Sequence, residues 1–596
     1  MKNKLSIKTQ FCVIGGGLAG ICAAVAAARR GAKVVLVHDR PVLGGNASSE
    51  IRMWIRGASE RHPEYREGGL IEEIAMDNIY YNPSMDYPMW DAVLYNKVIS
   101  EPNIELLLNA SVFDAITQNG KIISVKAWQL TTYTEIEICA DYFCDSSGDS
   151  ILAEFTGARF RSGREAADEF GESFAPPQSD NKTMGNSVLL QARQTHTKVK
   201  FTPPPFAKKF TKDSFPYRLN TTDRKGFVND NFWWLEIGGE DDTIRDAEKI
   251  RAELIPIAYG VWDFIKNSGV YDADEWELEW IGFLPGKREN RRYIGDYVLN
   301  QNDLQSGRIF EDEIAYGGWS IDEHHPKGLK TPKSPFLHHM VVPPYSIPYR
   351  CVYSVNIQNL FFAGRNISAT HIANSSTRVM ATCAAIGQAV GLAAWLCVKH
   401  GKTPRALKED ISKLQQLIRD DDCYLLGFKR ALSDAIKNST HNLSEANYLA
   451  LISGVERDFA DRKYCMEFEK GQSARFEFEK TYCKYIRLVF DNDIAREHAY
   501  NREVFNHQEF NMRQFPQRHN KPLDLKPAKT PPSLVKKFTI RVKIENKWID
   551  FFNEDNNFQR LRKILIDKKI SGIEFLGLET YGQEKIRLFS IDMLDA

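Results

Sequence analysis

Two short apolar runs near the start of the chain flank an alanine-rich segment. The runs, Phe11–Ile14 and Lys33–Val37, predict buried strands, and the segment between them predicts a helix. The turn before this helix, residues 15–20, reads GGGLAG and matches the pattern G-x-G-x-x-G. In such a turn the first glycine permits the tight bend, the second lets backbone approach a pyrophosphate, and the third lets the helix lie close to the strand. The pattern predicts a βαβ unit that binds a dinucleotide at the N-terminus of its helix.

The end of the second strand departs from the usual form of this unit. A carboxylate normally closes that strand and binds the ribose hydroxyls. Here His38 follows Val37 directly, and Asp39 comes one position later. Either the register is shifted by one residue so that Asp39 meets the ribose, or the ribose is held in another way.

Three further segments favour FAD over NAD as the dinucleotide. Gly44 and Gly45, just after the second strand, would let a loop pass close to the same cofactor. Residues 105–148 read as strands broken by the hairpin turn Asn119-Gly120, so a β-meander is inserted where a plain NAD domain needs none. Residues 359–398 read as a strand, a small-residue turn and a glycine-bearing helix, which could face the pyrophosphate from the other side.

The helix predicted at Met380–Val398 carries no charged residue over its whole length. A segment of this length and composition would also satisfy a search for membrane spans. Its small residues and the central Gln388 favour a buried helix packed on a sheet instead. We therefore expect no membrane span here.

Several stretches together resemble the FAD-dependent oxidoreductases of the glutathione-reductase-like flavoprotein superfamily. In chain order they read GGGLAG, RPVLGGNASSEIRMW, CDSSGDSILAEFTGA, FLPGKRENRRYIGDYVL, VPPYSIPYR and LFFAGRNISATHIANSSTRVMATCAAIGQAVGLAA, and they spread over roughly residues 8–400. The resemblance implies non-covalently bound FAD and redox chemistry, but it supplies no substrate. The residues expected to contact FAD are Gly15, Gly17, Leu18, Ala19, Gly20, Asp39, Arg40, Gly44, Gly45, Asn46, Ser48, Ser49, Arg52, Val112, Ser147, Gly148, Gly364, Arg365, Gly387 and Gln388.

Composition narrows the class of protein. The chain has 596 residues, too many for one hydrophobic core. Lys and Arg together number 78, as do Asp and Glu, so no net charge draws the chain to nucleic acid or to an anionic membrane. Its ten cysteines lack the C-x-x-C spacing, and only about ten polar residues precede the first strand, with no signal peptide. We expect a cytoplasmic protein with buried thiols.

The predicted fold class is α/β, with a Rossmann-like FAD-binding domain, an inserted β-meander, an α+β substrate domain and a C-terminal all-β sandwich. Residues 1–155 and 340–400 are expected to form the FAD-binding domain, residues 156–339 the substrate or cap domain, and residues 401–459 a helical connector. Short alternating strands from about residue 460 onward, for example Tyr482–Asp491 and Phe538–Glu545, predict the sandwich at 460–596. This region resembles a discoidin-like or galactose-binding-like fold by strand pattern alone. It could bind glycan, brace a neighbouring domain or form a homo-oligomer interface.

Flavin chemistry needs a group that gives or takes a proton near the substrate. The candidates are His371, Arg288, Arg292 and Arg378. His371 follows the small-residue turn after the strand at residue 360, and histidine is the usual acid or base near neutral pH. Arginines at 288–292, which the resemblance places near the active site, would suit an anionic or polyhydroxylated substrate.

The pairs His324-His325 and His338-His339 raise the question of a metal site. Adjacent side chains of a strand point to opposite faces, so neither pair can chelate alone, and we expect no metal.

The function predicted is hydride transfer between flavin and a polar small molecule, such as a carbohydrate or sugar acid, with an unknown electron acceptor. The alternatives are another substrate class such as a dicarboxylate or an unsaturated ring, a flavin-dependent isomerase, lyase or hydratase without net redox change, and a glycan-binding protein with a vestigial flavin fold.

Overall fold

The first apolar runs pair as parallel strands in one seven-stranded sheet. Its order is β3-β2-β1-β6-β5-β4, and β18 pairs with the end of β6. The strands β3, β2, β1, β6 and β18 are parallel, as a dinucleotide-binding sheet requires. The bounds are β1 (Asn3–Ile14), β2 (Val34–Val37), β3 (Ile104–Leu107), β4 (Ala110–Gln118), β5 (Lys121–Gln129), β6 (Thr134–Asp145) and β18 (Leu360–Phe362).

The β-meander expected between the strands is present. The antiparallel strands β4 and β5 join β6, and the turn between β4 and β5 is Asn119-Gly120. Both turn residues have positive φ, 51° and 72°, as a two-residue turn of type I′ requires. The meander sits in the same sheet as the parallel strands, so it extends the dinucleotide-binding domain instead of forming a separate one.

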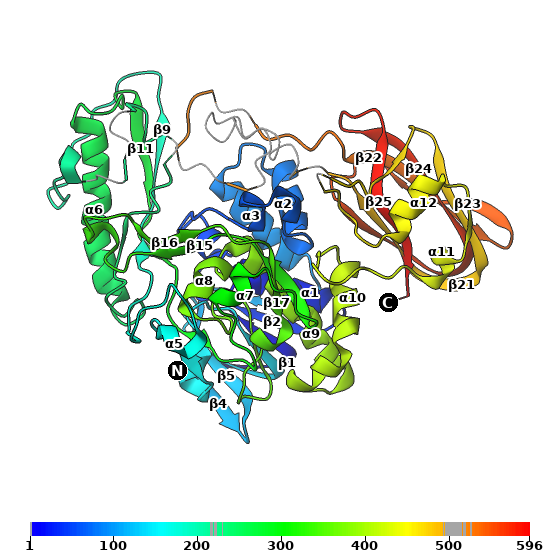
Figure 1. Ribbon diagram of the computed structural model, residues 1–596, viewed down its shortest axis with the longest axis horizontal. Coiled ribbons are helices and arrows are strands. Elements are labelled where there is room, and N and C mark those ends of the chain that lie inside the picture. Colours follow the sequence, from blue (N-terminus) through cyan, green and yellow to red (C-terminus); the bar gives the residue numbers. More distant parts are fainter. Residues whose placement is uncertain are drawn as a thin grey trace. The chain divides into compact units, whose positions relative to one another are not determined.

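Two helices pack closely against each other beside this sheet (Figure 1). They are α1 (Leu18–Arg29) and α9 (Met380–His400). A methyl group added to Gly387 would lie 2.1 Å from the Ala19 carbonyl oxygen, and one added to Gly391 would lie 2.2 Å from the Ala23 oxygen. The glycines of α9 therefore let the two backbones touch. Within the described residues α9 has the length and composition of a membrane span, but 89% of its apolar window is buried inside the protein, which confirms the prediction of a buried helix.

A second core lies between residues 188 and 281. It forms around α6 (Ala247–Asn267), whose buried face includes Leu254, Val261 and Trp262. The small antiparallel sheets of this part of the chain include β10 and β11, which contact α6, and β12, β15 and β16, which contribute residues to the cavity described below. Their strands are β8 (Asn186–Ser187), β9 (Leu190–Gln194), β10 (Glu236–Ile237), β11 (Trp276–Ile281), β12 (Gly286–Lys287), β15 (Ile321–His324) and β16 (Phe336–Met340). Trp234, Trp262 and Trp276 are buried and belong to this core.

The shorter elements connect these parts. They are α2 (Leu70–Tyr81), α3 (Tyr87–Ile99), α4 (Ile151–Thr156), β7 (Phe160–Arg161), α5 (Ala167–Phe170), β13 (Arg292–Tyr293), α7 (Gln301–Gln305), β14 (Glu313–Gly317), β17 (Tyr345–Pro348), α8 (His371–Thr377), α10 (Ile411–Asp420), α11 (Asp434–Lys437) and α12 (Glu445–Ile452).

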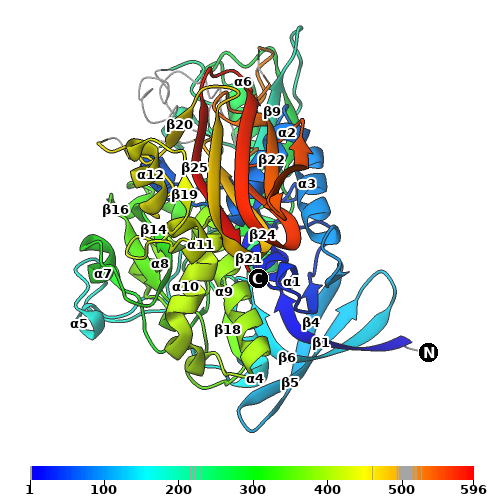
Figure 2. The same ribbon diagram turned by 90° about the vertical axis from the view of Figure 1, so that its right-hand side faces the viewer.

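The C-terminal region is an antiparallel sheet domain (Figure 2). Its strand order is β20-β25-β21-β24-β22-β23, and β19 also pairs with β21. Apolar positions of these strands form one buried core, to which Met76 and Met85 from the early part of the chain also belong. The strands are β19 (Thr440–His441), β20 (Met466–Phe468), β21 (Ser473–Phe490), β22 (Val535–Ile544), β23 (Lys547–Glu554), β24 (Leu561–Thr580) and β25 (Ile586–Leu594).

The computed structural model describes residues 3–214, 218–219, 223–228, 230–459, 461–492, 494, 515–516, 520–524 and 527–595. The chain divides into two compact units: Met1–Arg61, Asp86–Leu414 and Phe515–Lys526 form the first, and His62–Met85, Gln415–Gln514 and Pro527–Ala596 form the second. The predicted α/β class with a C-terminal β domain is confirmed. The finer domain boundaries and the discoidin-like resemblance stay predictions.

Candidate functional site

Three glycines of the turn after β1 have three different physical roles. Gly15 has φ +109°, and a methyl group on it would lie 2.4 Å from the Ser146 carbonyl oxygen. A methyl group on Gly20 would lie 1.9 Å from the Gly15 oxygen, so this glycine lets α1 pack against the turn. On Gly17 the same group would meet only the Gly45 Cα, at 4.0 Å, among protein atoms. Gly17 is thus the position where backbone is left open to a ligand.

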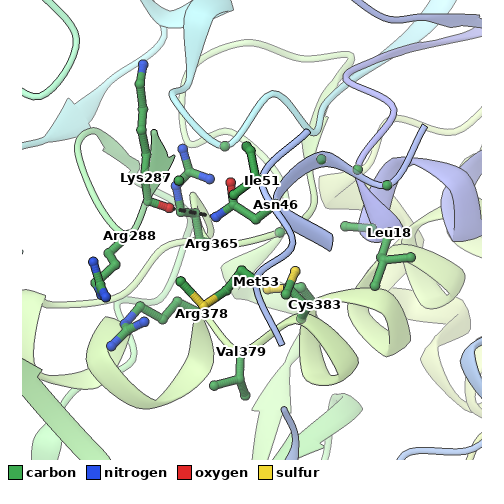
Figure 3. Close-up of a pocket in the computed structure, with 18 of the residues that line it drawn as sticks. Leu18, Asn46, Ile51, Met53, Lys287, Arg288, Arg365, Arg378, Val379 and Cys383 are labelled. Atoms are coloured by element: carbon green, nitrogen blue, oxygen red, sulfur yellow. Dashed lines mark hydrogen bonds between the residues drawn. The ribbon is translucent and has the colours of Figure 1, made fainter. Parts of the chain in front are cut away.

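A second glycine loop lies against the first. The Gly44 N–H donates to the Gly16 carbonyl at 2.8 Å, and Gly44 and Gly45 both have positive φ. A side chain on Gly45 would approach the Gly17 Cα to 3.1 Å. Asn46 follows and donates from its side chain to the Lys287 carbonyl at 2.9 Å, as the dashed line in Figure 3 shows. The loop after β2 therefore forms part of the same wall as the glycine turn.

His38 holds the end of β2 to the glycine turn. Its Nδ1 accepts the Gly16 N–H at 3.0 Å, and its Nε2 lies 3.0 Å from the Val42 carbonyl, to which it donates. Burial lowers the pKa of His38 to about 4, against the opposing effect of Asp39, so the ring is neutral and can accept at Nδ1. His38 and the more exposed Asp39 both line the cavity described next.

These loops enclose one side of a cavity of about 940 Å³. Of the residues predicted to contact a cofactor, most line it: Gly15, Gly17, Leu18, Ala19, Asp39, Arg40, Gly44, Gly45, Asn46, Val112, Ser147, Gly148, Gly364 and Arg365. In Figure 3 Leu18, on α1, lies on one side of this space, and Arg288 and Arg378 lie on the other. The start of α9 also reaches the cavity through Val379, Met380 and Cys383.

The remaining predicted cofactor residues do not line the cavity. Gly20 packs on Gly15, and Gly387 and Gln388 lie inside α9, where Gly387 meets α1. The guanidinium of Arg52 lies over the rings of Tyr87 and Trp280, with its carbon 4.7 and 4.3 Å from their centroids. Besides Gly20, five predicted cofactor residues do not line the cavity: Ser48, Ser49, Arg52, Gly387 and Gln388. The structure therefore places these predicted cofactor residues outside the cavity lining.

The wall fits FAD by its geometry. The N-terminus of α1 has Gly17 as its N-cap, no side-chain cap and no acidic residue in its first turn, so its free N–H groups can bind phosphate. Gly17 leaves room for close approach, and Asp39 lies at the end of β2 where a ribose is bound in such units. The turn after β6 lies directly beside Gly15, and its Gly148, together with Arg365 from the turn after β18, also lines the cavity.

A family model described as FAD dependent oxidoreductase matches residues 10–418. The chain belongs to this family. It is an FAD-dependent oxidoreductase, and the cavity described above lies in its first unit. A sequence search of curated proteins finds no significant match.

Solved structures similar to the oxidoreductase include a geranylgeranyl bacteriochlorophyll reductase-like protein from Thermoplasma acidophilum, at 11% identity over 70% of this chain and 87% of that chain, with a TM-score of 0.32. A p-nitrophenol 4-monooxygenase from Pseudomonas putida matches at 11% identity over 69% and 86% of the two chains, with a TM-score of 0.31. A family 32 carbohydrate-binding module from Streptococcus pneumoniae matches at 11% identity over 28% of this chain and 100% of that chain, with a TM-score of 0.18. TM-scores this low support no inference about function.

Four of the arginines that line the cavity are Arg61, Arg218, Arg288 and Arg378, and we name them the arginine wall. In Figure 3, Arg288 and Arg378 lie on the side of the cavity away from Leu18. Arg288 donates to the Ser187 hydroxyl at 2.8 Å and lies 3.3 Å from the Glu236 carboxylate. Arg378 lies 3.4 Å from Asp322. Within the described residues Arg61 and Arg218 form no ion pair; they donate to the Ser320 hydroxyl and the Gly328 carbonyl. The wall therefore has more positive than negative charge.

His371 lies outside the cavity, in a buried ionic cluster. Its Nδ1 is 2.8 Å from Glu289 and its Nε2 is 3.1 Å from Glu323. Arg292 pairs with the same Glu289 and, at 2.8 Å, with Glu165. Neither His371 nor Arg292 lines the cavity, whereas Arg288 and Arg378 do. Of the four predicted catalytic residues, the structure brings only these two arginines to the site.

The ionic cluster predicts a pH dependence of stability. Burial disfavours the imidazolium of His371, but Glu289 and Glu323 outweigh burial and raise its pKa to about 10. In the unfolded chain a histidine titrates near about 6.5. The stabilising effect is complete below the unfolded pKa and is lost as pH rises through the folded one. We expect the free energy of unfolding to fall between pH about 6.5 and about 10, by at most about 1.4 kcal/mol per pH unit from this group.

Urea unfolding at several pH values would measure this fall. In His371→Gln the fall should be shallower, while in His196→Gln, which changes an exposed histidine, it should match the unmodified protein. Equal slopes for His371→Gln and the unmodified protein would refute the assignment.

Sequence patterns did not reveal three further residues of the cavity. His324 and Asp322 line it from β15, and Asp230 lines it from the loop before β10. Burial raises the pKa of Asp230 to about 6, although it accepts hydrogen bonds from the Phe232 N–H and the Trp234 indole. The pair His338-His339 splits as a strand predicts: His338 bonds Glu323, and His339 lines the cavity. Among the described residues no group of three His, Cys, Asp or Glu side chains could hold a metal ion.

Proposed function

We propose that this FAD-dependent oxidoreductase oxidises a small hydroxylated molecule that bears a carboxylate, a class that includes sugar acids. The observation that carries the proposal is the arginine wall. Among the described residues, two carboxylates pair with its four guanidinium groups: Glu236, which lies outside the cavity lining, pairs with Arg288, and Asp322, which lines the cavity, pairs with Arg378. An anionic group of the substrate would balance this charge, and arginine binds carboxylates through two parallel hydrogen bonds.

The arginine wall also has apolar surface for the body of a substrate. The rings of Trp233 and Phe336 stack with centroids 5.2 Å apart, and both line the cavity. Trp319 lies beneath the Arg61 guanidinium, 5.3 Å from its central carbon. Flat rings beside fixed donors orient a small molecule and exclude water around it. The wall would thus bind the charged end of the substrate and position its reacting carbon toward the cofactor side.

Bound FAD supplies an acceptor for the electron pair of a substrate C–H bond. The protein supplies the positions. Gly15–Gly17 and the start of α1 would hold the pyrophosphate, and Asp39 the ribose. The N-terminal end of α9, at Val379 and Met380, presents its positive dipole to the cavity, where negative charge on a reduced ring would be stabilised.

The test is an anaerobic visible spectrum of the purified protein. Bound flavin should absorb near about 370 and 450 nm. Sugar acids, their neutral parent sugars, dicarboxylates and unsaturated ring acids would then be added one at a time. Bleaching by a hydroxylated acid but not by its neutral parent is expected. Bleaching by neutral sugars alone would refute the anionic substrate, and turnover without bleaching or an electron acceptor would favour an isomerase or lyase.

Arg378→Gln should weaken binding of the reacting acid about ten- to a hundredfold, because a charge-assisted hydrogen bond contributes about 1.5–3 kcal/mol. The control is Arg245→Gln, which changes an exposed arginine away from the cavity. Titration of flavin bleaching against acid concentration measures both. An unchanged affinity in Arg378→Gln would contradict the role of the arginine wall.

A further inference from the structure

His324, the last residue of β15, has a short contact at one nitrogen and a long one at the other. Its Nδ1 lies 2.5 Å from Glu236 Oε2. Glu236 does not line the cavity, and it also accepts the Gly185 N–H at 2.7 Å and lies 3.3 Å from Arg288. Burial would raise the pKa of Glu236, but Arg288 and His324 outweigh burial and lower it, so this carboxylate is ionised. An ionised carboxylate only accepts, so Nδ1 of His324 carries a proton and Nε2 is the nitrogen left for exchange.

We infer that the second nitrogen of His324 faces the cavity. Nδ1 points at Glu236 behind the wall, while His324 itself lines the cavity. Nε2 is 3.4 Å from Asp322 Oδ2, a long contact, and the same oxygen is 3.4 Å from Trp319 Nε1 and from Arg378. Asp322 is therefore shared among several donors and does not bind Nε2 tightly.

His371 and His324 differ in how many of their nitrogens have a close carboxylate partner and in whether they line the cavity. His371 has carboxylates within 3.1 Å of both nitrogens and lies away from the cavity, so its protons are held in place. His324 has one tight partner and one loose one, and it lies in the cavity wall. A base that a third group orients, with its other nitrogen directed at the substrate, is the arrangement that proton transfer requires.

Neighbouring rings fix the orientation of His324. Trp233 and Phe336 contact it edge-on, with ring centroids 5.0 and 5.7 Å from its own. The charged or titratable groups that face His324 and its two carboxylate partners come from several elements: Glu236, Asp322, Arg288, Arg378, Arg218 and His339.

We propose that His324 is the acid–base residue of the reaction and that Glu236 is its positioning residue. This rests on the proposed function. In the oxidative direction the substrate O–H and C–H bonds break and a C=O bond forms. The hydroxyl proton would go to Nε2 of His324, and FAD, when bound, would supply the acceptor for the hydride of the C–H bond. In the reverse direction Nε2 returns the proton to the carbonyl oxygen.

The first test does not depend on turnover. Diethyl pyrocarbonate, a reagent for accessible unprotonated histidine nitrogens, is applied to the FAD-loaded protein, and the labelled sites are located by mass spectrometry. We expect His324 to be labelled through the cavity and to be protected by malonate, used as a carboxylate probe for the arginine wall. His371 should stay unlabelled because both its nitrogens are occupied. Labelling of His371 in preference to His324 would overturn the inference.

The second test uses the acid that bleaches the flavin. His324→Gln should slow anaerobic bleaching about a hundredfold or more and remove one limb of its pH profile. Glu236→Gln should retain that limb but slow bleaching less. The control is His325→Gln, since His325 accepts the Lys327 N–H and does not line the cavity. FAD content and thermal stability, measured for each variant, show whether it folds.

The outcomes separate the two proposals. A protein that binds FAD but is bleached by no acid of the panel contradicts the proposed function, and the labelling result still decides whether Nε2 of His324 faces the cavity. Normal bleaching with an unchanged pH profile in His324→Gln contradicts the inference and leaves the proposed function standing. If His324→Gln fails to fold, Glu236→Gln and the labelling pattern still decide.

Discussion

Gly17→Val should abolish FAD binding while leaving the fold intact. Gly17 has φ −69° and ψ 174°, which any residue adopts, so the substitution strains no backbone. A Cβ at this position meets no protein atom closer than 4.0 Å. It would project into the space where the pyrophosphate is expected to approach the protein backbone. The branched side chain would keep the pyrophosphate from the N–H groups of α1. We expect the dissociation constant for FAD to rise by more than about a hundredfold, a loss of about 3 kcal/mol or more.

Gly20→Ala, in the same turn, should instead lower the stability of the fold, because the added methyl group meets protein atoms and not the cofactor. Its Cβ would lie 1.9 Å from the Gly15 carbonyl oxygen, so α1 must move away from the turn. Overpacking of this kind typically costs about 1–3 kcal/mol of folding stability. Flavin absorbance after purification, FAD titration and thermal unfolding separate the two outcomes. If Gly17→Val retained FAD, or lost stability as Gly20→Ala does, the assignment of Gly17 to the cofactor would be wrong.

Glu456→Gln should strongly destabilise the second unit. Arg487 is fully buried and donates to Glu456 at 2.5 and 3.0 Å, and Arg419 lies 3.7 Å from the same carboxylate. Burial opposes ionisation, but Arg487, Arg430 and Arg419 outweigh it and lower the pKa of Glu456 to about 2. Neutral glutamine would leave a buried guanidinium without its counter-charge. Breaking such a pair typically costs about 3–5 kcal/mol.

Chemical denaturation monitored on the C-terminal β domain measures this loss. The matched control is Glu467→Gln, in which the carboxylate is 44% exposed and pairs with Arg587 at 3.1 Å. Surface pairs contribute about 0–1 kcal/mol, so the control should change little. Similar losses in the two variants would contradict a specific role for the buried pair. The fold of the first unit is not expected to change, since Glu456 belongs to the second unit.

The residues around each turn were enough to predict the local elements. The glycine turn, the Asn119-Gly120 hairpin and the apolar helix α9 depend on backbone conformations and apolar periods that neighbouring residues set. Predicted residues near a turn, such as Gly17, Gly45, Gly148 and Gly364, consequently lie at the cavity. The family resemblance extended this reading to FAD.

Other assignments needed contacts between distant residues. Gly387 follows a strand and looks like a cofactor residue, but in space it lies against Ala19, because two small faces let α1 and α9 touch. His62–Met85 belongs to the same unit as the C-terminal strands, although more than 300 residues separate them along the chain. No local pattern records such pairings.

The choice between the histidines shows where sequence alone stops. Sequence by itself determined the dinucleotide fold, the cofactor and most of the loops that surround it, because these depend on glycine conformations and on local apolar order. Only the tertiary structure decided that His371 is enclosed by Glu289 and Glu323 while His324 lies in the cavity wall, oriented by Glu236. The reason is physical: proton transfer requires a nitrogen that faces the substrate, and its partners come from strands and loops that only folding brings together.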